Sequence, residues 1–269
     1  MEIGATLAKL ELSTSDPQKL ADFYSSAFKL EQSAHHDSIV CSAPGRELVF
    51  VPGEGGQLKR ASFSFKDVDS LSSYRSVLLS RGAELIEDKP HVITLADPHG
   101  HLVSFFTTAS LDNAPLPDDA RLQHFALRTP EPTKLAEFYT EKLGFVVSDR
   151  VLNDVGELTA IFMRTDAEHH AMAIFRAPMI RFDHLSCEVA DWVQLRDWAD
   201  HMASVGIDLA WGVGRHGPGN DTFFMVRDID GNMGEISSEL EICEQNRPAG
   251  VWPHRPQTLN QWGVAIMRS

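Results

Sequence analysis

Three residues in the second half of the chain could together bind a divalent metal ion. His124 stands in the stretch LQHFALR, His184 in FDHLSCEV and Glu235 in GNMGEISS. Two neutral imidazoles and one carboxylate suit iron, manganese or zinc, and such a set leaves coordination positions open for substrate and oxygen. Each residue lies in a predicted strand, so a curved sheet could bring the three together on its inner face.

Each of these residues also has an ordinary structural interpretation. A single histidine in a strand is more often a partly buried, hydrogen-bonded residue than a ligand, and Glu235 alone could be a surface residue. The combination favours a metal site because the first half differs at the matching positions. Aligning the two halves places Lys9 opposite His124, Phe63 opposite His184 and Ser104 opposite Glu235, which predicts no metal in the first half.

An internal repeat identifies the elements that would position these residues. The phrase KLADFY at residues 19–24 returns as KLAEFY at residues 134–139. Each copy follows an alternating run that predicts a strand and a polar residue with a proline that predicts a helix start. The leucine and the two aromatic residues of each copy lie at i, i+3 and i+4. The phrase is therefore predicted to be the buried face of a helix, without a catalytic role.

Two weaker units complete the pattern. The stretches beginning ASFSFKDVDS and FDHLSCEVAD each predict a strand, an acidic turn and an amphipathic helix that ends at Gly82 or Gly206. An Asp-x-x-Gly turn then joins the last two strands, at residues 97–100 and 228–231. We therefore predict an α+β fold of four modules, each a strand, a helix and further strands, arranged as two tandem pairs.

The predicted domain boundary lies between the two pairs. The stretch SLDNAPLPDDA at residues 110–120 is rich in proline and aspartate, which is typical of a linker. We predict an N-terminal domain over residues 1–112 without a metal and a C-terminal, metal-bearing domain over residues 113–269. The segment from Asn246 onward is rich in proline and tryptophan and is expected to pack over the second half as extended chain.

Composition restricts the possible partners. The chain has 269 residues and a formal net charge of −14, so it should repel the phosphate backbone of nucleic acids. No apolar run reaches the length of a membrane span, and the N-terminus lacks the pattern of a signal peptide. We expect a cytoplasmic protein that contacts neither nucleic acid nor membrane. The scattered Cys41, Cys187 and Cys243 favour buried thiols over disulfides or a cysteine metal site.

The chain resembles the vicinal oxygen chelate (glyoxalase/bleomycin resistance/dioxygenase) superfamily, and within it the type I extradiol ring-cleaving dioxygenases. The resemblance covers nearly the whole chain. It implies four βαβββ modules in two tandem pairs, each pair a curved mixed sheet that encloses a cavity. In that family, histidines in the first strands of modules three and four and a glutamate near the end of module four hold the metal. His124, His184 and Glu235 match those positions.

Two further motifs carry the resemblance. The segment at residues 212–232 is similar to the family's Gly-Arg-His-Gly segment, which implies that His216 donates a hydrogen bond to substrate. The stretch EHHAMAIF resembles the one that holds the family's acid/base histidine; either His169 or His170 could fill that role, and motif alignment favours His169. Met225 stands where the family usually has tyrosine. Phe223, Met225 and Trp192 are candidates for an aromatic pocket, with core packing as the alternative for each.

The resemblance implies Fe(II)-dependent extradiol cleavage of a catechol-type ring with O2, a reaction of aromatic hydrocarbon catabolism. Mn(II) accepts the same ligand set. The implied partners are a small aromatic diol and O2, and a homo-oligomer is expected. Two other functions on the same fold stay open. One is a glyoxalase-like metal-dependent isomerase or lyase, which would use a fourth protein ligand. The other is a non-catalytic binder of an aromatic compound, which needs no metal.

Overall fold

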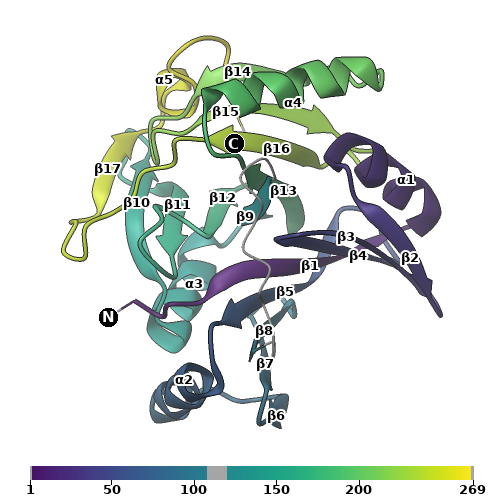
Figure 1. The fold of residues 1–269 in the computed structure, drawn as a ribbon. Coiled ribbons are helices and arrows are strands. Elements are labelled where there is room, and N and C mark those ends of the chain that lie inside the picture. The colour runs from purple at the N-terminus through teal and green to yellow at the C-terminus, as the bar shows by residue number, and fades with distance from the viewer. Residues whose placement is uncertain (1, 108–119, 268–269) are drawn as a thin grey trace.

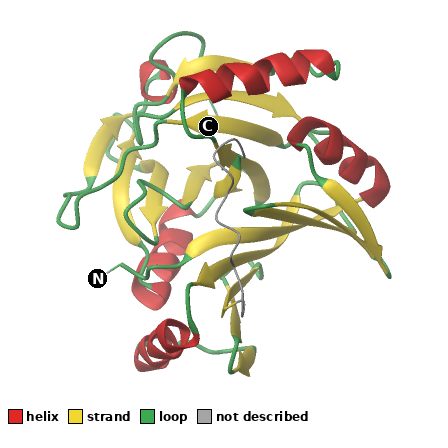
Figure 2. Cartoon of the chain, in the orientation of Figure 1, coloured by secondary structure: helices red, strands yellow, loops and turns green. Residues whose placement is uncertain are grey.

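The molecule consists of two curved mixed sheets with a few helices (Figure 1, Figure 2). The structure is a computed structural model and describes residues 2–107 and 120–267. The first half supplies strands β1 Thr6–Thr14, β2 Glu31–His35, β3 Ser38–Ala43, β4 Arg46–Pro52, β5 Gln57–Phe65, β6 Glu87–Lys89, β7 Val92–Ala96 and β8 Leu102–Thr107, and helices α1 Pro17–Phe28 and α2 Val68–Ser80. Its eight strands form one sheet in the order β2-β3-β4-β1-β5-β8-β7-β6.

The second half repeats the pattern and adds a tail. Its strands are β9 Arg121–Thr129, β10 Val146–Leu152, β11 Leu158–Arg164, β12 Met172–Arg176, β13 Arg181–Glu188, β14 Trp211–Arg215, β15 Thr222–Arg227, β16 Met233–Ser238 and β17 Gly250–Pro253. Its helices are α3 Pro132–Glu137, the π-helical turn η1 Phe138–Leu143, α4 Trp192–Ser204 and α5 Pro256–Leu259. The nine strands are ordered β14-β15-β16-β13-β9-β12-β11-β10-β17. The predicted α+β fold of four βαβββ modules is confirmed.

Local sequence signals begin α1, α2 and α4, whereas α3 begins at a proline without a side-chain cap. The side chains of Asp16, Asp67 and Asp191 each accept a hydrogen bond from the backbone N–H three residues later, at the starts of α1, α2 and α4. Such caps satisfy donors that the first helical turn leaves unpaired. After α2 and α4 the chain turns at Gly82 and Gly206, whose φ angles of 68° and 73° favour glycine.

The repeated phrase connects the two halves of the molecule. Tyr24 of α1 donates to Asp228 at 3.1 Å, and Tyr139 of η1 donates to Asp97 at 3.3 Å. The two aspartates begin the Asp-x-x-Gly turns, so the repeated tyrosine of each half bonds the turn of the other half. Burial, together with the nearby Asp228 carboxyl, raises the pKa of Tyr24 well above its ordinary value, so its hydroxyl stays protonated and donates.

The predicted buried helix face is confirmed for most of its residues. Leu20, Tyr24, Leu135 and Tyr139 are fully buried, whereas the neighbouring Phe23 and Phe138 are only partly buried against the same core. That core is one cluster with members from both halves. The halves therefore share their hydrophobic interior and do not form two separately packed units.

The tail lies along the second half, as expected. β17 pairs in parallel with β10, and the short helix α5 follows it.

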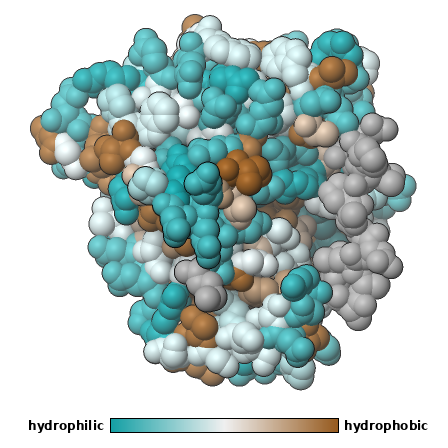
Figure 3. Space-filling view, turned by 60° about the vertical axis from the view of Figure 1, so that its left-hand side comes forward, coloured by the Kyte–Doolittle hydropathy of each residue, from teal (hydrophilic) through white to brown (hydrophobic). Residues whose placement is uncertain are grey.

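The predicted domain boundary at residues 112–113 lies outside the described residues, as does most of the predicted linker. All three cysteines are buried and free, which confirms that prediction. The face drawn in Figure 3 is largely hydrophilic, with small, separate hydrophobic patches.

Among the helices of residues 2–107 and 120–267, none combines the length and the apolar character that a membrane crossing requires.

Tyr24→Phe tests the connection between the halves, because it removes a hydroxyl and almost no volume. We expect it to lower the free energy of unfolding by about 1.5–3 kcal/mol, the range for hydrogen bonds to charged groups. Tyr74→Phe is the matched control. It removes a 2.9 Å bond to the neutral carbonyl of Leu143, which should cost about 0.5–1.5 kcal/mol. Denaturant unfolding measures both; a larger loss for Tyr74→Phe would contradict the assignment.

Candidate metal centre and cavity

The pairing of three adjacent strands brings the predicted ligands together. β13 lies between β9 and β16. Its Ser186 pairs with His124 of β9 and with Glu235 of β16, so those two ligands stand in one row on either side of a small serine. His184 lies two residues before Ser186, on the same face of the central strand. The three side chains therefore converge above Ser186.

The spacing of the three ligands suits one shared ion. Their ligand atoms all lie within 4.8 Å of one another, and all three residues are buried. The Nε2 atoms of His124 and His184 are 3.1 Å apart, and His184 Nε2 lies 3.8 Å from Glu235 Oε2. Two nitrogens bound at about 2.1 Å, at a right angle, to one ion are about 3.0 Å apart. The histidine pair matches that separation.

Neighbouring oxygens set the tautomers of the two histidines. Nδ1 of His124 contacts the amide oxygen of Gln123, and Nδ1 of His184 lies 2.6 Å from a carboxylate oxygen of Asp183, whose other oxygen pairs with Arg128. These oxygens accept, so each ring carries its proton on Nδ1 and the two Nε2 lone pairs face each other. Burial and the nearby His184 lower the pKa of His124 well below its ordinary value. A cation between the facing lone pairs would stabilise them, so these residues fit a divalent metal.

A second group is less suited to a metal. His216, Asp221 and Glu235 also offer atoms within 4.8 Å of one another. Burial raises the pKa of Asp221 to about 8, so this carboxyl must first lose a proton to bind an ion at neutral pH. Sequence analysis missed Asp221 because an aspartate after Gly-Asn is typical of a turn.

The metal set opens onto a small cavity. Its lining residues are His124, Phe162, His170, Phe175, His184, Trp211, His216, Pro218, Met225, Thr258 and Leu259. Strands of the nine-stranded sheet supply six of these residues, α5 supplies Thr258 and Leu259, and loops supply His170, His216 and Pro218. Apart from the histidines, the lining is almost entirely apolar, and within the described part of the chain it contains no lysine, arginine or tyrosine. The chemistry of the lining therefore matches an uncharged aromatic ring, and side chains around the free volume of about 20 Å³ would have to move to admit one.

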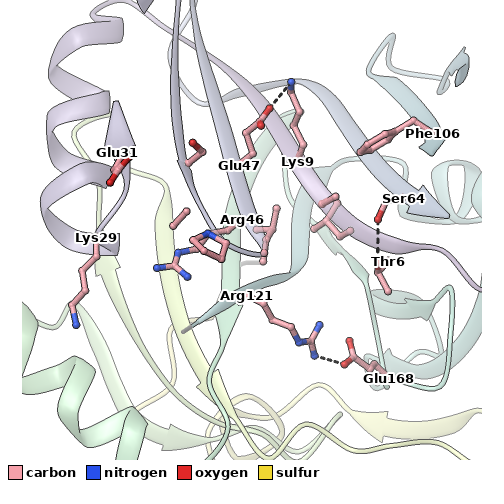
Figure 4. A pocket seen from close by; sticks show the side chains of 17 residues that line it. Thr6, Lys9, Lys29, Glu31, Arg46, Glu47, Ser64, Phe106, Arg121 and Glu168 are labelled. Atoms are coloured by element: carbon pink, nitrogen blue, oxygen red, sulfur yellow. Dashed lines mark hydrogen bonds and ion pairs between the residues drawn. The ribbon is translucent and has the colours of Figure 1, made fainter. Parts of the chain in front are cut away.

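A larger hollow of about 1130 Å³ lies elsewhere, between the first half and the edge of the second. Figure 4 shows Lys9 pointing toward Glu47 and Arg121 pointing toward Glu168 along its wall. The Lys9–Glu47 pair is 2.6 Å apart. These opposite charges neutralise each other, and no member of the metal set lines this hollow, so we place the chemistry in the smaller cavity.

The structure reverses the expected order of the two adjacent histidines. His170 lines the cavity, and its ring centroid lies 4.2 Å from that of His124. His169 is fully buried behind it, with Nε2 at 3.1 Å from Asp149. The alignment preference for His169 is therefore wrong. Adjacent residues of extended chain face opposite sides, so a one-residue error exchanges the two roles.

Of the three residues predicted for an aromatic pocket, the structure places one at the cavity. Met225 lines the cavity and pairs across the sheet with Glu235. Phe223 lies on the same strand face but is covered by His216, whose ring stacks on it with centroids 3.8 Å apart. Trp192 is 44% exposed at the start of α4, against Trp262. It does not reach the cavity, because α4 covers the outer side of the sheet (Figure 1).

Several cavity residues were not predicted from the sequence. Phe162 of β11 and Phe175 of β12 line the cavity, as do Trp211 and Leu259. β11 and β12 are buried along almost their whole length. Alternation therefore gave no signal of which side chains face inward.

The structure also corrects the comparison of the two halves. In the first half, Ser62 pairs with Lys9 on one side and with Ser104 on the other. In the second half, Ser186 pairs in the same way with His124 and with Glu235. By this register the counterpart of His184 is Arg60, not Phe63. The alignment with Phe63 matched Asp67 to Glu188. The residue that caps the helix of the second half, as Asp67 caps that of the first, is Asp191. Two cations therefore occupy the histidine positions in the first half, which supports the expectation that it binds no metal.

Comparisons with known proteins agree with this geometry. Residues 121–236 match the family model described as Glyoxalase/Bleomycin resistance protein/Dioxygenase superfamily, and residues 9–106 match a Glyoxalase-like domain. Metapyrocatechase 2 of Cupriavidus necator is 31% identical over 251 residues, covering 81% of this chain and 75% of the relative. Biphenyl-2,3-diol 1,2-dioxygenase of Pseudomonas sp. strain KKS102 is 28% identical over 236 residues, covering 76% and 80%.

Solved structures share the fold. The Mn(II)-bound glyoxalase from Novosphingobium aromaticivorans superposes with a TM-score of 0.80 at 21% identity, covering 100% of this chain and 93% of its own. Homoprotocatechuate 2,3-dioxygenase from Brevibacterium fuscum, in complex with 3,4-dihydroxyphenylacetate, gives a TM-score of 0.79 at 22% identity, covering 97% and 89%. At these identities the structural likeness establishes the fold alone.

His184→Ala tests the metal site, because it removes the ligand on the central strand β13. The Nε2 lone pair of that ligand is oriented by the contact between its Nδ1 and Asp183. We expect the metal content to fall from about one divalent ion per chain to near zero. His35→Ala, at an exposed position in β2, is the control and should leave the metal content unchanged. Elemental analysis measures both. Wild-type metal content in His184→Ala would refute the ligand assignment, and two ions per wild-type chain would refute the prediction for the first half.

Proposed function

Because this chain belongs to the vicinal oxygen chelate superfamily, as one of its type I extradiol ring-cleaving dioxygenases, we propose that it cleaves a neutral catechol with O2, using Fe(II). The observation that carries the proposal is the convergence of His124, His184 and Glu235 beside a cavity that the two histidines line together with two further histidines. Mn(II) is the alternative metal, since the ligand set accepts both.

The metal supplies redox chemistry and the protein supplies position and proton transfer. Fe(II) in this site would bring a catechol and O2 together and pass electrons between them. Holding both reactants in one small cavity removes most of the entropic cost of their meeting. The apolar walls of Phe162, Phe175, Trp211 and Leu259 exclude water from the reacting groups.

His170 is the acid/base residue in this proposal. It lines the cavity beside His124, within the space that substrate and oxygen would enter. Burial and the surrounding histidines lower the pKa of His170 well below its ordinary value. The ring is therefore neutral before reaction and is able to accept a proton from a catechol hydroxyl.

His216 positions the substrate, in a manner that differs from the expected one. Its Nδ1 lies 2.6 Å from the carbonyl oxygen of Leu259, which can only accept, so Nδ1 carries the proton. A neutral His216 then offers Nε2 to the cavity as an acceptor for a substrate hydroxyl, rather than as a donor. The stacked ring of Phe223 fixes the plane of the imidazole.

The lining indicates which catechols would bind. Among the described residues it contains no lysine or arginine that could pair with a substrate carboxylate, and Met225 occupies the place of the family's usual tyrosine. We therefore propose an uncharged catechol, unsubstituted or with apolar substituents. The expected homo-oligomer and cytoplasmic location remain predictions, to be tested by analytical ultracentrifugation and by cell fractionation.

Oxygen consumption by anaerobically purified, Fe(II)-loaded protein tests the reaction. Catechol and methylcatechols should give O2 uptake matched by a yellow ring-cleavage product. For 3,4-dihydroxyphenylacetate we expect kcat/KM at least about tenfold lower, because its carboxylate would be buried without a cation. Protein stripped of metal by a chelator is the control. Tight catechol binding without O2 uptake would contradict the proposal, and preference for the carboxylated substrate would contradict the assignment of its class.

His170→Ala tests the acid/base assignment separately. We expect kcat to fall about 10²- to 10⁴-fold, the usual contribution of a positioned acid/base group, while metal content stays at the wild-type level. His35→Ala should retain wild-type kcat. Loss of metal from His170→Ala would instead make His170 a ligand, and unchanged kcat would remove it from the reaction.

A further inference from the structure

Behind His170, two ionisable side chains that the proposed reaction leaves without a role, His169 and Asp149, continue a series of contacts away from the cavity. Nδ1 of His170 lies 3.0 Å from Nδ1 of His169, and Nε2 of His169 lies 3.1 Å from Oδ2 of Asp149. The side chains of His169 and Asp149 are completely buried. The series begins at β10, passes through the segment between β11 and β12, and ends at the cavity wall.

Asp149 is held as an ionised acceptor by the C-terminal tail. Its Oδ1 accepts from Arg247 Nη1 and from the backbone N–H of Gly250, each at 3.0 Å, and its Oδ2 accepts from Trp252 Nε1 at 2.7 Å. Burial alone would raise the pKa of Asp149, but contacts from His169, Arg247 and Trp252 outweigh it and lower the pKa to about 2. The carboxylate is therefore charged at neutral pH.

The charged carboxylate determines where the protons of the two histidines lie. The His169–Asp149 contact is at ion-pair distance without the alignment of a linear hydrogen bond, and electrostatic attraction still favours a proton on Nε2 of His169. A neutral His169 with that proton has its lone pair on Nδ1. Nδ1 of His170 must then be the donor in the 3.0 Å contact between the rings. This leaves Nε2 of His170 as the lone pair that faces the cavity.

We propose that Asp149 and His169 are positioning residues that hold His170 in the Nδ1–H tautomer, with Nε2 directed into the cavity. The inference rests on the proposed function, in which His170 accepts a substrate proton. A carboxylate that orients a catalytic imidazole through its far nitrogen is an established way to select the reactive tautomer. Here His169 lies between the carboxylate of Asp149 and the imidazole of His170, and the tail residues Arg247 and Trp252 hold the carboxylate in place.

Neutron diffraction from deuterium-exchanged crystals of the metal-loaded protein locates the protons directly. We expect a deuteron on Nδ1 of His170 and on Nε2 of His169, and a bare Nε2 on His170. A deuteron on Nε2 of His170 would overturn the proposal. This measurement does not depend on turnover, so it separates a failure of the positioning inference from a failure of the proposed function.

Two substitutions of His169 test the consequence for catalysis. His169→Leu removes the acceptor for His170, whereas His169→Asn keeps an oxygen near the position of Nδ1. We expect His169→Leu to lower kcat about 10- to 100-fold, with KM and metal content within about twofold of wild type, and His169→Asn to recover most of kcat. Equal losses in both variants, or a loss of metal, would indicate a merely structural role and overturn the proposal.

Asp149→Asn is the second variant if His169→Leu does not fold. It removes the charge that holds the proton on Nε2 of His169 and should reproduce the kcat loss, again without loss of metal. A wild-type kcat in folded Asp149→Asn would exclude a role for the carboxylate. If the wild-type protein cleaves no catechol, the neutron result alone decides whether the series orients His170.

Discussion

The pairing register of β9, β13 and β16 is the constraint on which the rest of the site depends. Ser186 pairs with His124 on one side and with Glu235 on the other, and its small side chain leaves the space into which His184 also points. Because side chains alternate between the two faces of a strand, a slip of one residue in either pairing would turn a ligand away from the cavity. The buried apolar residues around these strands make such a slip costly.

The half of the molecule without a metal set supports that register. α1 of the first half packs against β16 closely enough that a Cβ added at Gly234 would lie 2.6 Å from the ring of Phe28. Gly234 directly precedes Glu235, so the first half reaches the backbone beside a ligand. The reciprocal bonds from Tyr24 to Asp228 and from Tyr139 to Asp97 join the halves by the repeated phrase itself. The two repeated halves thus hold each other in place, and the first half contacts the strand that carries Glu235.

One rule accounts for all four histidines of the cavity. In each, Nδ1 contacts a partner outside the cavity: Gln123 for His124, Asp183 for His184, the Leu259 carbonyl for His216 and His169 for His170. Under the proposed function, the Nε2 atoms would bind the metal or exchange a proton. The same imidazole would then serve as ligand, substrate acceptor or base, according to its position on the cavity wall.

The sequence by itself determined the four modules, the helix start at Asp16 and Pro17, and the set of His124, His184 and Glu235. These features depend on local signals, such as alternation, capping residues and turn residues, which repeat visibly along one chain. The tertiary structure alone decided that His170 rather than His169 faces the cavity, that Trp192 lies outside it, and that Arg60 replaces His184 in the first half. It also revealed Asp149 and the apolar walls of Phe162 and Phe175. The place of Trp192 depends on the side of the sheet that α4 covers. The other features depend on strand register or on which side chains of extended, buried chain point inward, and continuous burial does not indicate that choice.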